Sequence, residues 1–143
     1  MSAFPHKELD CVSYTSLIHF LYRHMKLLDE GLIEEWAACF TDDGVFATES
    51  VPSPVRGRES IVVGAKAAKE QLDADGISRR HWLGMTEAWV ADDGKVIAHS
   101  YALTLQTTAE AQATMRFFNI CHDTLVQKSD GTWLIEARSI TRS

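Results

Sequence analysis

The chain has 143 residues, the size of one ordinary domain, and we expect a single domain over residues 1–143. Its net charge of −6 and its scattered basic residues exclude the concentrated positive field of a nucleic-acid-binding protein. No apolar stretch approaches the roughly 20 residues of a membrane helix, and no charged-then-apolar leader opens the sequence. The cysteines, Cys11, Cys39 and Cys121, form no CxxC pair. We therefore expect a cytoplasmic protein with neither nucleic-acid nor membrane partners.

The first half of the chain predicts three helices. Apolar and aromatic residues from Tyr14 to Leu28 fall within one arc at about 100° per residue, which predicts a long first helix. The same spacing indicates a shorter helix over residues 33–40 and a third over about residues 59–72. Between them, Thr41-Asp42-Asp43-Gly44 predicts a turn, and residues 45–48 predict one short strand.

The second half predicts a long antiparallel meander. Asp92-Asp93-Gly94 and Ser129-Asp130-Gly131 indicate hairpin turns between consecutive strands. Helices followed by strands indicate an α+β fold, in which a curved sheet wraps against helices and leaves a conical cavity. The strands are rich in β-branched and aromatic residues and are expected at residues 82–90, 95–107, 113–128 and 132–141.

Asp29 is the first candidate for chemistry. Its spacing from Tyr22 and Met25 puts all three on nearly the same face of the first helix as Ile18. A carboxylate on an apolar face is costly unless it has a partner, so this position indicates a pocket. The alternative, which the pattern alone favours, is a solvated loop residue at the edge of the helix.

His81 is the second candidate. It opens the first long strand, and alternation puts it on the face of Leu83. A histidine there is either a satisfied core residue, which the pattern alone favours, or a pocket base. The near-neutral pKa of histidine suits proton transfer if the ring reaches a cavity.

The polar residues of the later strands are interpreted as structural or exposed when each is taken alone. Arg138 could bind an anion, but pairing with Glu136 or another surface carboxylate is the favoured interpretation. Cys121 and His122 form no nucleophile–base pair, because neighbours in a strand point to opposite faces. GxGxxG, P-loop, GxSxG and HExxH patterns are absent, so we expect no cofactor and no metal.

Several stretches resemble SnoaL-like proteins of the nuclear-transport-factor-2 (NTF2) superfamily. They are Leu27–Trp36, Ala38–Phe46 and Asp123–Ile135, and Arg80–Trp89 is similar to fungal scytalone dehydratase. The resemblance covers roughly residues 14–142. It implies an NTF2-like, cone-shaped α+β barrel in which three N-terminal helices pack on a curved antiparallel sheet.

The resemblance also implies an Asp–His pair. The dehydratase family uses an aspartate near the end of its first long helix, hydrogen-bonded to a histidine that opens a strand, and Asp29 and His81 stand at those positions. The pairing would stabilise the carboxylate and raise the basicity of the imidazole. The family's second catalytic histidine corresponds to Gln106, and its two tyrosines correspond to Leu28 and Thr48. Dehydration of the same substrate is therefore not expected.

We accordingly expect an acid–base enzyme, a cofactor-independent dehydratase, isomerase or cyclase acting on a carbonyl-bearing, mostly apolar, natural-product-type small molecule. His81 would be the general base and acid, and Asp29 would orient it. Tyr22, Gln106 and His122, the last at the position of a pocket asparagine in the family, would hydrogen-bond the substrate. The alternatives are a ligand-binding module, a structural subunit like the small subunit of ring-hydroxylating oxygenases, or a pure dimerisation domain. The family implies a homodimer, with a trimer as the other possibility.

Overall fold

The computed structural model describes residues 7–110 and 112–143. Residues 1–6, part of the N-terminus in which no leader pattern was expected, lie outside the described residues. The elements in chain order are β1 (Lys7–Glu8), α1 (Cys11–Asp29), α2 (Ile33–Ala37), β2 (Phe40–Thr48), β3 (Val55–Arg56), α3 (Arg58–Ala74), β4 (Ile77–Val90), β5 (Val96–Thr108), β6 (Thr114–Gln127) and β7 (Trp133–Arg142).

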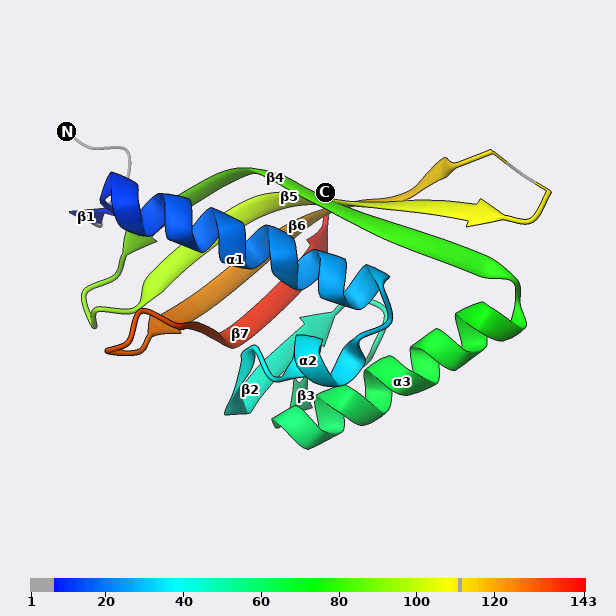
Figure 1. Ribbon diagram of the computed structural model, residues 1–143, viewed down its shortest axis with the longest axis horizontal. Helices are drawn as coiled ribbons and strands as arrows, with labels where there is room; N and C mark the ends of the chain where they lie inside the picture. Colours follow the sequence, from blue (N-terminus) through cyan, green and yellow to red (C-terminus); the bar gives the residue numbers. More distant parts are fainter. Residues whose placement is uncertain (1–6, 111) are drawn as a thin grey trace.

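One sheet contains all seven described strands, in the order β1-β4-β5-β6-β7-β2-β3. Neighbouring strands are antiparallel except β2 and β7, which are parallel. Because β1 and β3 are separate edges, the curved sheet stays open and does not close into a complete barrel. The three helices gather on one face of it (Figure 1). This arrangement confirms the expected α+β, NTF2-like architecture.

Helix α1 positions Asp29, which is its last residue. The helix begins where the Asp10 side chain accepts a hydrogen bond of 2.9 Å from the Ser13 backbone N–H, a standard N-cap. It buries Leu17 and Leu21 completely against the sheet. It ends before Gly31, whose φ of 79° reverses the chain at low steric cost. In the described part of the chain, no helix is long and apolar enough to cross a membrane.

The core lies between the helices and the inner face of the sheet. Along β5 and β6 the buried residues alternate with outward ones, as a sheet covered on one face requires. The buried hydrophobic cluster joins α1 and α2 to five strands and includes Leu17, Leu21, Met25, Trp36, Phe40, Leu83, Ala98, Cys121, Leu125 and Ile135.

The four long strands and the three helices confirm the sequence predictions, with three corrections. The second helix ends at Ala37, and Phe40, which was expected inside it, begins β2. Residues 41–44, which were expected to form a turn, belong to β2. Phe40 pairs with Ile135 and Val45 pairs with Ala137, so the polar residues between them form an irregular stretch inside the strand. Strand β4 begins at Ile77, so His81 lies within the strand and does not open it.

Candidate active site

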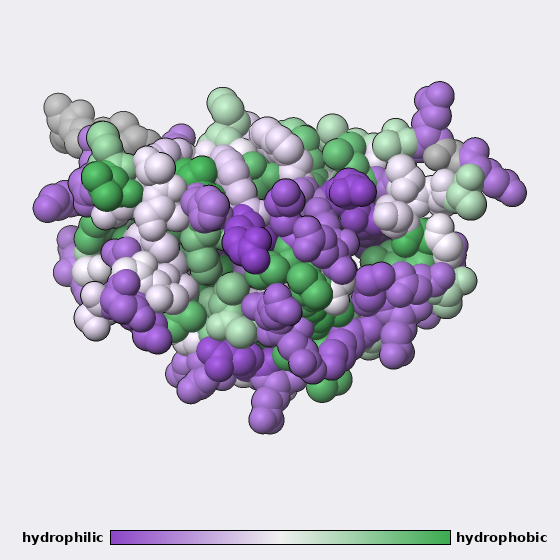
Figure 2. All heavy atoms as spheres, viewed as in Figure 1, coloured by the Kyte–Doolittle hydropathy of each residue, from purple (hydrophilic) through white to green (hydrophobic). Residues whose placement is uncertain are grey.

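A cavity of about 180 Å³ lies between the end of α1, α2 and the inner face of the sheet. A second lobe of about 320 Å³ extends toward α3, and His81 lines both lobes. Figure 2 shows hydrophobic residues between hydrophilic rims on this side of the molecule. The apolar side chains that line the first lobe are Met25, Leu28, Trp36, Phe46, Ala102, Phe117 and Ile140, and its uncharged polar residues are Thr48, Ser50, Thr104 and Asn119.

Asp29 and His81 form a direct pair at the junction of these lobes. The ring Nδ1 of His81 lies 2.6 Å from Asp29 Oδ1. The same carboxylate accepts the backbone N–H of His81, at 3.1 Å to Oδ1 and 3.0 Å to Oδ2. Because a carboxylate accepts hydrogen bonds, the geometry places the ring proton on Nδ1. Nε2 then carries the lone pair and can take a proton.

The edge of the sheet explains why this pair forms. Strand β1 pairs with β4 at Trp89 and Val90, and no strand in the described part of the chain pairs with this edge of β4 near His81. The His81 N–H that points away from β5 needs an acceptor, and the last residue of α1 supplies it. Asp29 therefore has two roles: it accepts the unpaired backbone N–H at the edge of β4, and it orients the imidazole of His81. Among the described residues, none forms a hydrogen bond with Nε2 of His81.

The three residues expected to bind substrate lie elsewhere. Tyr22 of α1 and His122 of β6 line a separate depression, together with Tyr14, Met85 and Tyr101. Alternation along β6 turns Cys121 and Asp123 inward and His122 outward. Gln106 accepts a hydrogen bond of 2.9 Å from Nε of Arg79, its cross-strand partner. The structure thus brings together Asp29 and His81 but none of these three with them.

The outer face of the sheet carries exposed apolar side chains. They belong to β4, β5 and β6, and they are Trp82, Met85, Tyr101, Leu105, Met115 and Phe118. A patch of this kind is a typical association surface. The homodimer nevertheless stays a prediction, because a single chain is described.

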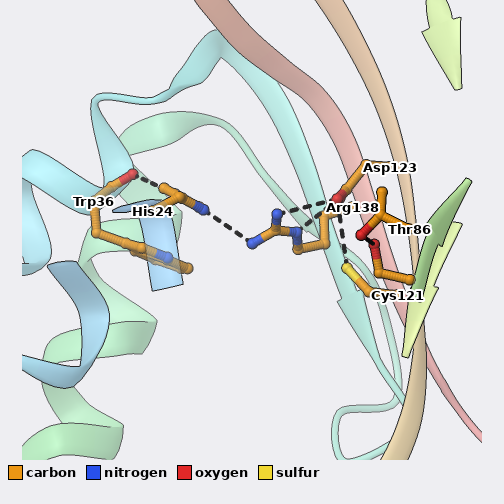
Figure 3. A network of polar contacts seen from close by, with 7 residues as sticks. His24, Trp36, Thr86, Cys121, Asp123 and Arg138 are labelled. Carbon is orange, nitrogen blue, oxygen red and sulfur yellow. Dashed lines mark hydrogen bonds and ion pairs between the residues drawn. The ribbon is translucent and has the colours of Figure 1, made fainter. Parts of the chain in front are cut away.

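Arg138 is buried, which corrects the expectation that it lies on the surface. Its guanidinium and the Asp123 carboxylate are 1% and 0% exposed. Nε donates to Asp123 Oδ1 at 2.7 Å, Nη2 donates to Oδ2 at 3.1 Å, and Nη1 lies 3.0 Å from His24 Nδ1. Figure 3 shows Arg138 held between His24 and Asp123. A fork-to-carboxylate pair of this kind neutralises the cation at the base of the cavity.

This network fixes the protonation of its members. Burial and the neighbouring Arg138 hold the pKa of His24 well below its ordinary value, so the ring is neutral and its Nε2–H donates to the Trp36 carbonyl at 2.9 Å. Burial alone would lower the pKa of Arg138, but Asp123 outweighs it and the net pKa is raised. Burial raises the pKa of the Cys121 thiol, which makes it a poor nucleophile.

Sequence reasoning missed three cavity residues, Arg79, Thr104 and Asn119. The alternation of inward and outward side chains along each strand could have revealed them. Arg79 lies two residues before His81 on β4, and Asn119 lies two residues before Cys121 on β6, so each shares the inner face with a residue already placed there. Thr104 is the cross-strand partner of His81. Among the described residues, no group of three or more His, Cys, Asp or Glu side chains could hold a metal ion.

The comparisons with known proteins agree with this fold. The SnoaL-like domain model matches residues 12–139, and the chain therefore belongs to the SnoaL-like family. No curated protein matches the sequence. The family and its structural neighbours support a small-molecule-binding protein of the NTF2-like kind.

Solved structures are similar over nearly the whole chain. ActVI-ORFA from Streptomyces coelicolor is 30% identical with a TM-score of 0.83, over 91% of this chain and 94% of that one. A Catenulispora acidiphila protein solved in complex with S-DNPA is 32% identical with a TM-score of 0.79, over 93% and 95% of the two chains. A putative scytalone dehydratase from Novosphingobium aromaticivorans shares the fold at 17% identity, with a TM-score of 0.75 over 92% and 85%.

Proposed function

We propose that the protein is a cofactor-independent acid–base enzyme acting on a carbonyl-bearing, mostly apolar small molecule of the polyketide type. The observation that carries the proposal is the 2.6 Å contact between Asp29 and His81 Nδ1, which leaves Nε2 available to take a proton on a side chain that lines the cavity. The Catenulispora acidiphila relative, solved with S-DNPA, supports a small organic ligand for a fold of this kind.

In the proposed reaction His81 Nε2 removes a proton from the carbon next to a carbonyl. The resulting imidazolium stays bonded to Asp29, whose charge stabilises it. The imidazolium can then return the proton to a leaving hydroxyl, which completes a dehydration, or to another carbon, which completes an isomerisation. If the enolate carbon instead attacks a second carbonyl of the same molecule, His81 protonates the new alkoxide and a ring is closed.

The developing enolate oxygen needs a hydrogen-bond donor, and the inner face of the sheet offers two. Thr104 stands directly across from His81, and Asn119 stands across from Ala102 on the next strand. Both side chains line the same lobe as His81. We propose that they take the role that the sequence had suggested for Tyr22 and His122. Donors positioned at such an oxygen contribute substantially to rate.

Exchange of acidic C–H protons tests the proposal without knowledge of the natural substrate. 2-Tetralone and a set of fused-ring β-ketones are incubated in D₂O with the wild-type protein, and deuterium incorporation is followed by NMR. We expect His81→Asn to lower the exchange rate at least about 100-fold, because a positioned imidazole contributes roughly 10²- to 10⁴-fold. His122→Asn, on the outer face, serves as the matched control and keeps the wild-type rate.

A folded His81→Asn variant with the full exchange rate would refute the acid–base proposal. If the wild-type protein exchanges none of these probes and co-purifies with an oxygenase large subunit, a structural role is the better account.

A further inference from the structure

With a single exception, each charged side chain around the two lobes is paired with an oppositely charged residue or with a histidine. Asp29 pairs with His81, Arg138 with Asp123, Lys69 with Asp73 at 2.6 Å, and Arg142 with Glu49 at 3.6 Å. These pairs account for every other charged side chain that lines either lobe. The remaining charge is Arg79, which lines both lobes. Among the described residues, no carboxylate lies within ion-pair distance of it.

Arg79 is held in a fixed position although it lacks a counter-ion. Its Nε donates to Gln106 Oε1 at 2.9 Å, and its guanidinium carbon lies 5.5 Å from the centre of the Phe117 ring. Arg116 packs on the same ring at 4.6 Å, so a second cation stands nearby. Burial and Arg116 both lower the pKa of Arg79, which shows that its environment opposes its positive charge. A half-buried cation of this kind is stabilised by an anionic ligand.

We infer that Arg79 is the anion receptor of this cavity and that the substrate carries a carboxylate, which Arg79 binds while His81 acts on a carbon elsewhere in the molecule. The part of this inference that concerns the action of His81 on a substrate carbon rests on the proposed function. Since Gln106 occupies only Nε, both terminal nitrogens of Arg79 remain available for the two oxygens of a carboxylate.

The strand geometry sets the spacing that such a substrate needs. Arg79 and His81 are two residues apart on one face of β4, so their Cα atoms are separated by roughly 7 Å. In a substrate whose carboxylate is bound to Arg79, the carbon that His81 deprotonates would therefore lie about one ring away from that carboxylate. Phe117, the cross-strand neighbour of Thr104, provides apolar lining beside these residues. The substrate class is therefore a ring-bearing carboxylic acid with a carbonyl. A neutral ketone lacks the group that Arg79 recognises.

Calorimetric titration with 2-naphthoate and with its neutral counterpart 2-naphthamide tests this inference. We expect the wild-type protein to bind the carboxylate about 10- to 100-fold more tightly, the range for a hydrogen-bonded ion pair. Arg79→Gln is expected to bring the ratio to about one while the affinity for the amide is kept. Arg80→Gln is the matched control, because the neighbouring side chain is exposed on the opposite face of β4.

Gln106→Glu tests the same point without removing the arginine. The new carboxylate would lie where Gln106 Oε1 lies, pair with Arg79 and abolish the preference for 2-naphthoate. Equal affinities in the wild type, no measurable binding of the carboxylate, or a preference that survives Arg79→Gln would overturn the inference. His81→Asn should keep the preference, so a failure of the acid–base proposal remains distinguishable from a failure of this one.

Discussion

Replacing Asp123 by asparagine is expected to lower the free energy of unfolding by about 3–5 kcal/mol, the typical cost of breaking a buried ion pair. The amide removes the charge that compensates Arg138, which is almost completely buried. It also weakens two hydrogen bonds, from Nε and Nη2 of Arg138. The cation is left without a partner beside a neutral His24, so no described neighbour can take over the role.

Chemical denaturation of the wild type and the variant measures this effect, with the slope checked for two-state behaviour. Glu34→Gln is the matched control. It removes the carboxylate of the Lys66–Glu34 pair, whose side chains are largely exposed, and the midpoint is expected to stay almost unchanged. A loss below about 1 kcal/mol for Asp123→Asn would contradict the view that this pair anchors the inner face of the sheet.

The second large effect is expected at Asp29. Asp29→Asn keeps an oxygen that can accept the backbone N–H of His81, so the fold should be retained. The amide N–H then faces Nδ1 and forces the ring proton onto Nε2, where it blocks the base. We expect the C–H exchange rate to fall about 10²- to 10⁴-fold, most of what a positioned imidazole contributes.

The measurement is the same NMR exchange assay, with circular dichroism to establish that the variant folds. Asp75→Asn is a suitable control, since this exposed aspartate also stands at the end of a helix but reaches no lobe of the cavity. An Asp29→Asn variant that folds and exchanges at the wild-type rate would show that the carboxylate only completes the edge of β4.

Periodicity was sufficient to predict most of the fold. The apolar arc of α1 and the alternation along β5 and β6 both show which side of an element is buried. This pattern can be read from neighbouring residues in the sequence, without knowledge of distant contacts. The two-residue strands β1 and β3 are too short to show any period. The irregular start of β2 has the composition of a turn, and only its pairing with β7 makes it part of the sheet.

The site was accessible to sequence reasoning only in part. Asp29 and His81 are 52 residues apart, and each alone has an ordinary structural interpretation, so the family resemblance was needed to pair them. Arg138 lies 15 residues from Asp123 and 114 from His24. A strand arginine appears exposed until such distant partners are known. Gln106 could be assigned to Arg79 only from the register of β4 and β5.

The most direct test of the account is the position of the ring proton on His81. Long-range ¹H–¹⁵N NMR correlations, recorded at a pH where the imidazole is neutral, distinguish a protonated from an unprotonated ring nitrogen. We predict a protonated Nδ1, bonded to Asp29, and an unprotonated Nε2. A wild-type protein in which Nε2 carries the proton would contradict it, because His81 could then not serve as the base.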